Sequence, residues 1–496
     1  MPGERSRGTM ALNLNLLKLK EFGVVAEIRQ DVVSVTGLSN CMNGQLVLIE
    51  DKARGVIVGF DPDYVLVLIV KAIGKVKPGD KVTTTLDAFK VSVGMGFIGR
   101  RVNALAEPID GQGVIKEDDL YPIFNTAPTV LQREPLNEVL ETGTKSVDMT
   151  LPIGKGQRML ILGDRMTGKT TIGVDAIVNQ RGKNVICIYC GIGKAEAALD
   201  RVSEVFDTEG VWDYGIMVTA GASDSMGQQY LVPYVATSIG EYFMYAKGMD
   251  VLLVFDDFTK HAWAYRQISL LLERAPGRDA YPGDIFYIHS QLVERAGKMK
   301  PELGGGTMTH LPIVETQQGD FAGYIPSNII SMTDGQIFLN STLFGEGFKP
   351  AVDLGLSVSR IGSKVQWPAM KKPTSMLKID YVRFRELQKL TRIKAGSSSD
   401  LDARLMKGKI LEEVLKQDYN APVPMEEQVL LLFALQNGLF EGVQPPEVHS
   451  LNARFIERLR TKRQDLIDML IAEKRMTETL SKGLLDELNA FKNSTL

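Results

Sequence analysis

The sequence contains little cysteine and little histidine. Only three of its 496 residues are cysteines, which excludes a disulfide-rich scaffold and fits a reducing compartment. Cys187 and Cys190 have C-x-x-C spacing, but their apolar surroundings are typical of a buried strand, on which residues three apart point to opposite faces. The four histidines follow no metal-ligand spacing. We therefore expect these two cysteines to be small buried side chains, and the sequence indicates no zinc site.

Long apolar runs and an excess of one charge are also missing. The longest strongly apolar block, residues 65–70, has the length of a strand and is far shorter than the ~20 residues of a membrane helix. Residues 1–8 contain no apolar signal region, so we do not expect secretion. Lys and Arg number 57 and Asp and Glu number 60, and the resulting net charge of −3 gives no indication of nucleic-acid binding.

A short N-terminal extension, residues 1–20, is followed by three zones with different hydrophobic patterns. Residues 21–90 hold short apolar runs separated by turn residues, a pattern typical of a small β-barrel domain. Residues 91–367 alternate strands with helical stretches and predict a parallel α/β sheet. Residues 368–496 have a helical pattern. In this last zone one apolar stripe at helical spacing consists of Phe455, Ile456, Leu459, Leu466, Met469 and Leu470.

The sharpest motif is a G-x-x-x-x-G-K-T run at residues 163–170. It follows a predicted strand and precedes a predicted helix, which is the context that a phosphate-binding loop (P-loop) requires. Glycines let backbone N–H groups turn toward phosphate oxygens, and the helix N-terminus adds a favourable dipole potential. Within the motif, Lys169 would reach the β- and γ-phosphates. The predicted nucleotide-binding residues are Gly163, Asp164, Arg165, Met166, Thr167, Gly168, Lys169 and Thr170.

A magnesium site is predicted beside this loop. Thr170 offers a hydroxyl to Mg²⁺. Asp256 directly follows the apolar run 251–255 and can hold the ion through its water shell, and we favour it over the adjacent Asp257 for that reason. Acids at strand ends often only cap loops, but the pairing with a P-loop favours the metal role.

The carboxylate that activates water in an ATPase is missing from its expected place. In RecA-like cores this acid commonly lies at the end of the strand after the P-loop helix, here residues 185–189. That strand leads to Lys194, and Glu196 lies two residues out of register. Such a site would bind ATP and turn it over poorly. The alternative, in which Glu196 or another residue activates the water, stays open.

Seven segments together are highly specific for one family. They are GRRVNALAEPIDG (99–111), GDRMTGKT (163–170), AYRQISLLL (264–272), PGRDAYPGD (276–284), ETQQGD (315–320), IPSNIISMTDGQIF (325–338) and GLSVSRIG (355–362). In these segments the chain resembles the alpha-subunit family of F-type ATP synthases, over about residues 21–440. The resemblance implies a multidomain α/β fold with an N-terminal β-barrel, a central RecA-like P-loop nucleotide-binding domain and a C-terminal α-helical bundle. This fold agrees with the three zones.

The resemblance also implies roles for single residues. The P-loop lysine and threonine and the aspartate after the apolar run fall on the family's own positions. Arg360 matches the arginine finger that the alpha subunit gives to the catalytic site of the neighbouring beta subunit. Lys349 and Pro350 match a pair beside the adenine of the bound nucleotide, with Lys in place of the family's Arg, and Gln417 matches another adenine-side residue.

Several positions depart from the family pattern. Alpha subunits usually have Gln where Lys194 stands, and beta subunits have the catalytic Glu there. Lysine brings a permanent positive charge, which could pair with a phosphate or displace Mg²⁺. Met166 replaces a usual Gln, and Tyr419 stands where a second adenine-side Gln is typical. The segment before Glu21 is shorter than the family's N-terminal helix, which leaves open the contact with the delta subunit and the peripheral stalk.

The resemblance implies a non-catalytic, regulatory subunit that binds ATP or ADP with Mg²⁺ in the F1 sector of a rotary ATP synthase. Its partners would be beta subunits in an alternating α3β3 hexamer and the gamma central shaft, and its complex would couple ATP synthesis or hydrolysis to proton or sodium transport. The subunit would be peripheral, on the cytoplasmic face of a bacterial plasma membrane or the matrix or stromal face of an organelle membrane, and would meet the membrane only through the Fo sector. Alone it would have negligible activity.

Two alternatives belong to other classes. One is a catalytic homohexameric P-loop ATPase of the secretion or helicase type. Lys194 argues against it, as does the absence of a basic or aromatic stripe for RNA. The other is an F1-like complex repurposed away from ATP synthesis, which the divergent positions allow.

Overall fold

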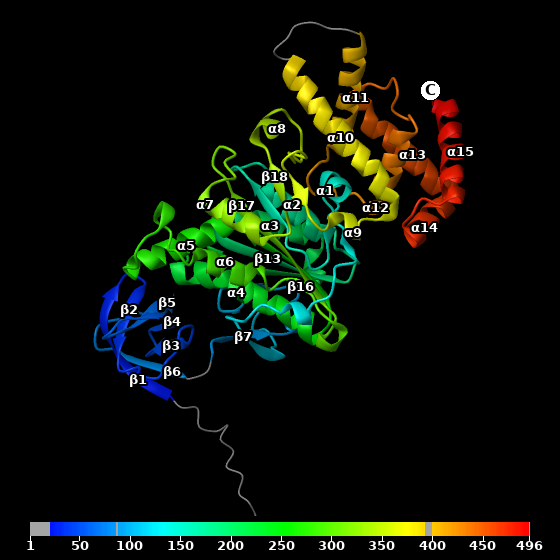
Figure 1. The fold of residues 1–496 in the computed structure, drawn as a ribbon. Helices are drawn as coiled ribbons and strands as arrows, with labels where there is room; N and C mark the ends of the chain where they lie inside the picture. Colours follow the sequence, from blue (N-terminus) through cyan, green and yellow to red (C-terminus); the bar gives the residue numbers. More distant parts are fainter. Residues whose placement is uncertain (1–19, 86–87, 392–398, 496) are drawn as a thin grey trace, which may run out of the picture. The chain divides into compact units, whose positions relative to one another are not determined.

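A computed structural model describes residues 20–85, 88–391 and 399–495 of the chain (Figure 1). Of the predicted N-terminal extension, only Lys20 lies among these residues. The chain divides into two compact units. Of the described residues, the first unit comprises those up to residue 90 together with 225–228 and 267–275, and the second comprises the others. The predicted architecture of barrel, nucleotide-binding α/β domain and helical C-terminal region is confirmed.

The first unit contains a closed barrel with the strand order β1-β2-β5-β4-β3-β6. Its interior is filled by apolar side chains such as Val33, Val47 and Ile57, all of them fully buried. Closure pairs the edges of the sheet, so no strand edge is left free. The strands are β1 (Lys20–Arg29), β2 (Val32–Thr36), β3 (Leu46–Ile49), β4 (Ala53–Phe60), β5 (Val65–Ala72) and β6 (Lys81–Thr85).

The second unit is built on a nine-stranded sheet with the order β19-β18-β12-β17-β15-β13-β14-β8, in which β16 pairs with β17. The strands from β18 to β8 run parallel, as predicted, whereas β19 and β16 are short antiparallel additions. The bounds are β8 (Arg101–Val102), β12 (Leu160–Gly163), β13 (Val185–Lys194), β14 (Gly215–Gly221), β15 (Asp250–Asp256), β16 (Gly297–Lys298), β17 (Thr307–Glu315), β18 (Gly335–Leu339) and β19 (Val358–Ser359).

Helices cover both faces of this sheet. Gly173 of α2 (Lys169–Val178) packs against Val254 of β15, and Gly240 of α4 (Met226–Glu241) packs against Val251 of the same strand. Residues three apart on a strand point to opposite faces, so the two helices lie on opposite sides. Burial on both faces explains why β13 reads as a continuous apolar run.

Cys187 and Cys190 both lie on β13 and are fully buried, as expected. They are free thiols, and burial raises the pKa of each well above its usual value. Within the described ranges, no helix is both long enough and apolar enough to span a membrane.

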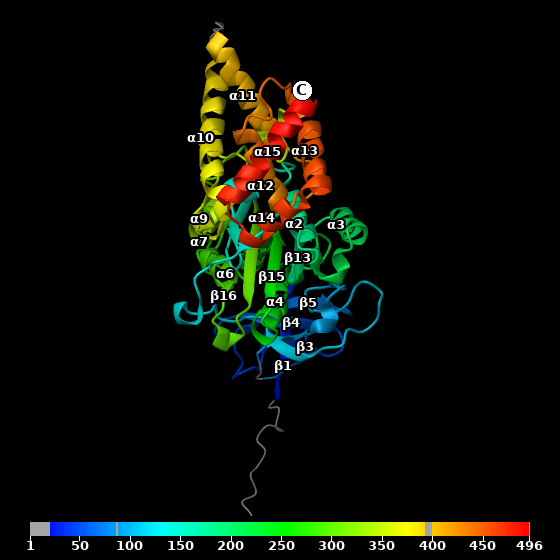
Figure 2. The same ribbon diagram turned by 90° about the vertical axis from the view of Figure 1, so that its right-hand side faces the viewer.

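Six longer helices form the C-terminal region and gather at one end of the nucleotide-binding sheet (Figures 1 and 2). The predicted apolar stripe is buried, except for Met469, which is partly buried against the same core. It spans two helices, because the chain leaves helical geometry at Arg463. The helices are α10 (Pro368–Thr391), α11 (Ser399–Leu415), α12 (Met425–Gln436), α13 (Val448–Lys462), α14 (Gln464–Glu473) and α15 (Glu478–Thr495).

Candidate nucleotide site

The eight predicted P-loop residues run from the last residue of β12, Gly163, through the connecting turn to the first two residues of α2, Lys169 and Thr170. Gly168 precedes the helix with φ 95°, a left-handed conformation that glycine adopts at little cost. The side chain of Met166, at the tip of the turn, is 83% exposed. The turn thus presents the start of α2 at the carboxyl end of a parallel strand, where α/β sheets usually bind ligands.

Hydrogen bonds hold the loop in shape. The Lys169 ammonium donates to the carbonyl oxygens of Gly163 (2.9 Å) and Asp164 (2.5 Å), and burial lowers its pKa. The Asp164 carboxylate accepts bonds from the Thr316 hydroxyl and the Gly319 N–H, both at 2.7 Å. Burial works against the charge of Asp164, but these bonds outweigh it and its pKa is lowered. The loop is therefore tied to the segment that follows β17.

Asp256 lies at the centre of a buried polar cluster. Its side chain is fully buried, and its Oδ2 accepts hydrogen bonds from the hydroxyls of Thr170 (2.6 Å) and Tyr189 (2.9 Å). The predicted proximity of Thr170 and Asp256 is therefore present. Tyr189 was not predicted for this site, because it lies mid-strand and reads as an ordinary buried residue.

Lys194 joins this cluster from the end of β13. Its Nζ lies 2.6 Å from Asp256 Oδ1 and 3.8 Å from Asp257 Oδ2. Burial opposes the charge of Lys194, but the two carboxylates outweigh burial and raise its pKa. Burial also raises the pKa of Asp257, although Lys194 acts in the opposite direction. The cation that replaces the expected acid is thus paired with the predicted metal ligand.

The side chains around Asp256 provide oxygen ligands but also a competing positive charge. This ion prefers oxygen ligands, and the Thr170 hydroxyl and the Asp256 carboxylate provide such oxygens side by side. The ammonium of Lys194, however, occupies the other oxygen of Asp256 and brings its own positive charge. With Lys194 in this position the residues do not fit Mg²⁺.

Two further carboxylates lie near the ends of these strands. Glu196 opens α3 (Glu196–Thr208) and pairs with Arg101 on the edge strand β8, which does not favour the alternative in which Glu196 activates water. Glu315 ends β17, which lies between β12 and β15. Its negative charge helps to raise the pKa of Lys194, and it opposes the lowering of the pKa of Lys169 by burial. Sequence reasoning missed Glu315 as a site residue, although it ends an apolar strand in the same way as Asp256.

The predicted adenine-side residues lie together. The backbone N–H of Gln417 donates to the carbonyl of Lys349 (2.9 Å), and Pro350 follows Lys349. The Gln417 amide accepts a bond from the Lys145 N–H and donates to the carbonyls of Gly143 and Ala421, all at 2.8 Å. The side-chain amide of Gln417 is therefore engaged within the chain, and it holds this group in place.

The same group is linked to the P-loop helix. The N–H of Asn420 donates to Asp175 Oδ1 on α2 at 3.0 Å. Asp175 lies six residues, or about 9 Å along the helix, from Lys169. Tyr419, next to Asn420, is 76% exposed.

Arg360 directly follows β19, which is the edge strand of the sheet at the opposite end of the strand order from β8. Its N–H donates to the carbonyl of Asp334, directly before β18, whereas the P-loop begins beside Leu339, at the other end of that strand. These ends are four residues, or about 13 Å, apart. The Arg360 side chain is exposed, and within the described part of the chain it has no hydrogen-bond or ion-pair partner. Arg360 is thus free to contact another molecule and is remote from its own P-loop.

Comparison with known proteins gives a consistent result. The pattern of the ATP synthase alpha/beta family, nucleotide-binding domain, matches residues 143–359, and that of the ATP synthase alpha/beta chain, C terminal domain, matches residues 366–491. The chain is 43% identical to ATP synthase subunit alpha of Clostridium acetobutylicum over 476 residues, covering 96% of this chain and 94% of the relative. It is 42% identical to the same subunit of Petrotoga mobilis over 480 residues, covering 96% and 95% of the two chains. It is also 42% identical to that of Clostridium botulinum, covering 96% and 94%.

Proposed function

The chain belongs to the ATP synthase alpha/beta family as an alpha subunit, and we propose that it is a non-catalytic, regulatory subunit that binds ATP or ADP in the F1 sector of a rotary ATP synthase. Phosphates would bind at the P-loop, Gly163 to Thr170, and the adenine would lie beside Lys349, Pro350 and Gln417. The proposed complex synthesises or hydrolyses ATP together with proton or sodium transport.

The observation that carries the non-catalytic role is the contact between Lys194 and Asp256. Hydrolysis needs a group that orients or polarises the attacking water. The expected position of that group holds a cation, whose ammonium lies 2.6 Å from a buried carboxylate oxygen. A lysine bound in this way cannot accept a proton from water, so the site is suited to holding a nucleotide and not to cleaving it.

Binding of Mg²⁺ by Thr170 and Asp256 stays a prediction, and it depends on the position of the Lys194 side chain. The two side chains supply oxygens, but the ion requires Lys194 to leave Asp256. Mg²⁺ would supply positive charge beside the phosphates, and Lys194 offers that charge from within the chain.

For Arg360 we propose the arginine-finger role toward a beta subunit. Its exposure, its lack of a partner in the described residues and its distance from the chain's own P-loop support action on a nucleotide held by a neighbour. Arginine is suited to this role because its planar guanidinium contacts two phosphate oxygens and stays protonated.

We propose beta and gamma subunits as partners, in an alternating α3β3 hexamer around the gamma shaft. The subunit would be peripheral, at the cytoplasmic face of a bacterial plasma membrane or the corresponding face of an organelle membrane, and would meet the membrane only through Fo. The N-terminal residues that bear on the delta subunit and the peripheral stalk lie outside the described ranges. Nucleic acid is not among the partners that we propose.

A repurposed F1-like complex remains the second candidate, because Lys194, Met166 and Tyr419 depart from the family pattern. Purification of the native complex separates it from the first. Co-purification with beta, gamma and Fo subunits supports ATP synthase, and an α3β3 assembly without Fo subunits supports the alternative. A homohexamer of this chain would instead support a catalytic ATPase of another class.

The isolated chain is expected to bind ATP and to hydrolyse it negligibly, because a formed P-loop lies beside Lys194 in place of an acid. Equilibrium dialysis with labelled ATP measures the binding, and release of labelled phosphate measures the hydrolysis. Lys169→Ala is expected to abolish the binding. Robust turnover by the purified chain that disappears in Lys169→Ala would contradict the proposal.

A further inference from the structure

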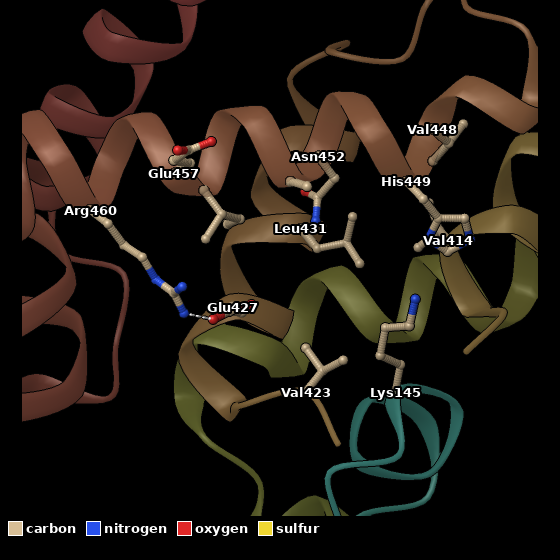
Figure 3. A pocket seen from close by; sticks show the side chains of 12 residues that line it. Lys145, Val414, Val423, Glu427, Leu431, Val448, His449, Asn452, Glu457 and Arg460 are labelled. Carbon is tan, nitrogen blue, oxygen red and sulfur yellow. Dashed lines mark hydrogen bonds and ion pairs between the residues drawn. The ribbon is translucent and has the colours of Figure 1, made fainter. Parts of the chain in front are cut away.

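A cavity of about 250 Å³ lies among α1, α11, α12 and α13, away from the P-loop (Figure 3). Helix α1 (Lys145–Thr150) contributes Lys145, and α13 contributes His449, Asn452 and Arg460. Much of the remaining lining is apolar and consists of Val414, Val423, Leu431, Val448 and Ile456. The cavity therefore combines a hydrocarbon wall with a few polar groups.

Lys145 is the unusual member of this lining. Its side chain is 5% exposed, and within the described ranges its ammonium has no hydrogen-bond or ion-pair partner. Figure 3 shows the ammonium pointing from α1 toward His449 on α13. Glu413, a nearby acid, is engaged with Lys416 and lies 3.8 Å from the His449 ring. Burial disfavours this charge and lowers the pKa of Lys145 to about 8, although the charges of Glu413 and Asp418 act in the opposite direction. The ammonium therefore has two carboxylates in its surroundings but no direct partner.

The other polar groups indicate the charge that the cavity can accept. Asn452 has a buried side-chain oxygen without a hydrogen-bond partner in the described residues, and this acceptor does not pair with an anion, so a carboxylate would lie at Lys145 and not at Asn452. Glu427 and Arg460 pair with each other at the other end, so their charges cancel. Glu457 adds a negative charge to the same lining. One unpaired positive charge beside an acid favours a ligand with a single negative charge over a doubly charged phosphate.

We propose that this cavity binds a small monocarboxylate with an apolar body. The carboxylate pairs with Lys145, and the hydrocarbon lies against the apolar wall formed with Val414 and Ile456. Pairing gives the buried ammonium a direct partner, and transfer of the apolar body of the ligand out of water adds to the affinity. The cavity adjoins the proposed adenine-side group, because the Lys145 N–H donates to the Gln417 side chain, but its lining includes no P-loop residue and the inference does not depend on the role proposed for the P-loop.

The test measures binding of hexanoate to the purified full chain by isothermal titration calorimetry. Hexanamide, which has the same shape without the charge, is expected to bind at least about tenfold more weakly, because it cannot form the ion pair. Lys145→Met, which keeps the length of the side chain, is expected to weaken hexanoate binding by at least about tenfold. Lys389→Met, on an exposed part of α10, serves as the matched control and is expected to change nothing.

Three results would overturn the proposal. They are no hexanoate binding to the wild-type chain, equal affinity for hexanoate and hexanamide, or undiminished hexanoate binding by a folded Lys145→Met chain. The comparison of the two probes uses only the wild-type chain, so the proposal stays falsifiable even if Lys145→Met does not fold.

Discussion

Replacing Arg360 by lysine is expected to lower multi-site ATP hydrolysis of the reconstituted complex by about 10³-fold, because an arginine finger contributes roughly 10³–10⁵ in rate. Negative charge develops on the γ-phosphoryl oxygens during transfer, and a guanidinium delivered by the neighbour contacts two of them. Lysine keeps the charge but not the planar fork, so it is a poor substitute. Arg360 lies at the sheet edge remote from its own P-loop, so the effect should appear only in the assembled complex.

The experiment compares steady-state hydrolysis by complexes that contain wild-type chain, Arg360→Lys or Arg201→Lys. Arg201 is exposed on α3 and serves as the matched control. The Arg360→Lys complex should assemble and bind nucleotide normally. Near-normal turnover would contradict the finger role, and failure to assemble would assign Arg360 to the subunit interface instead.

Replacing Lys194 by glutamine is expected to make nucleotide binding by this chain depend on Mg²⁺. The wild-type chain should bind ATP with similar affinity with and without Mg²⁺, because the ammonium already lies on Asp256. An ammonium and a divalent ion within one small site repel each other by several kcal/mol at an effective dielectric constant of about 20. Without that ammonium, Mg²⁺ should increase ATP affinity by roughly 100-fold, which corresponds to about 2.7 kcal/mol.

Equilibrium dialysis of ATP against the isolated chain, in Mg²⁺ or in EDTA, measures this difference. Lys372→Gln, an exposed substitution on α10, is the matched control and should behave as wild type. If wild type and Lys194→Gln show the same response to Mg²⁺, Lys194 has no influence on the cation at this site.

Local patterns were sufficient where the chemistry lies within one short segment. The P-loop could be predicted because strand, glycine turn and helix follow one another within about twenty residues. The closeness of Thr170 and Asp256 could also be predicted, since the carboxyl ends of parallel strands meet at one edge of a sheet. Burial of Cys187 and Cys190 followed from the apolar run around them.

Contacts that depend on strand order could not be predicted in this way. Lys194 meets Asp256 because β13 pairs with β15, with Gly191 opposite Asp256, and this pairing joins strands separated by a long stretch of sequence. Glu315 reaches the site because β17 inserts between β12 and β15. The position of Arg360 could likewise not be predicted, because it depends on the antiparallel pairing of β19 with β18. Hydrophobic periodicity indicates strands but not their neighbours.

The most direct test of the non-catalytic role follows ATP bound to this chain during turnover of the whole complex. Complex loaded with γ-labelled ATP is chased with unlabelled ATP while hydrolysis proceeds, and the nucleotide on this chain is then photo-crosslinked and identified. The account predicts that the label on this chain remains ATP over many turnovers, because Lys194 leaves the site without a water-activating acid. Release of that label as free phosphate, at the rate at which the complex turns over, would contradict it.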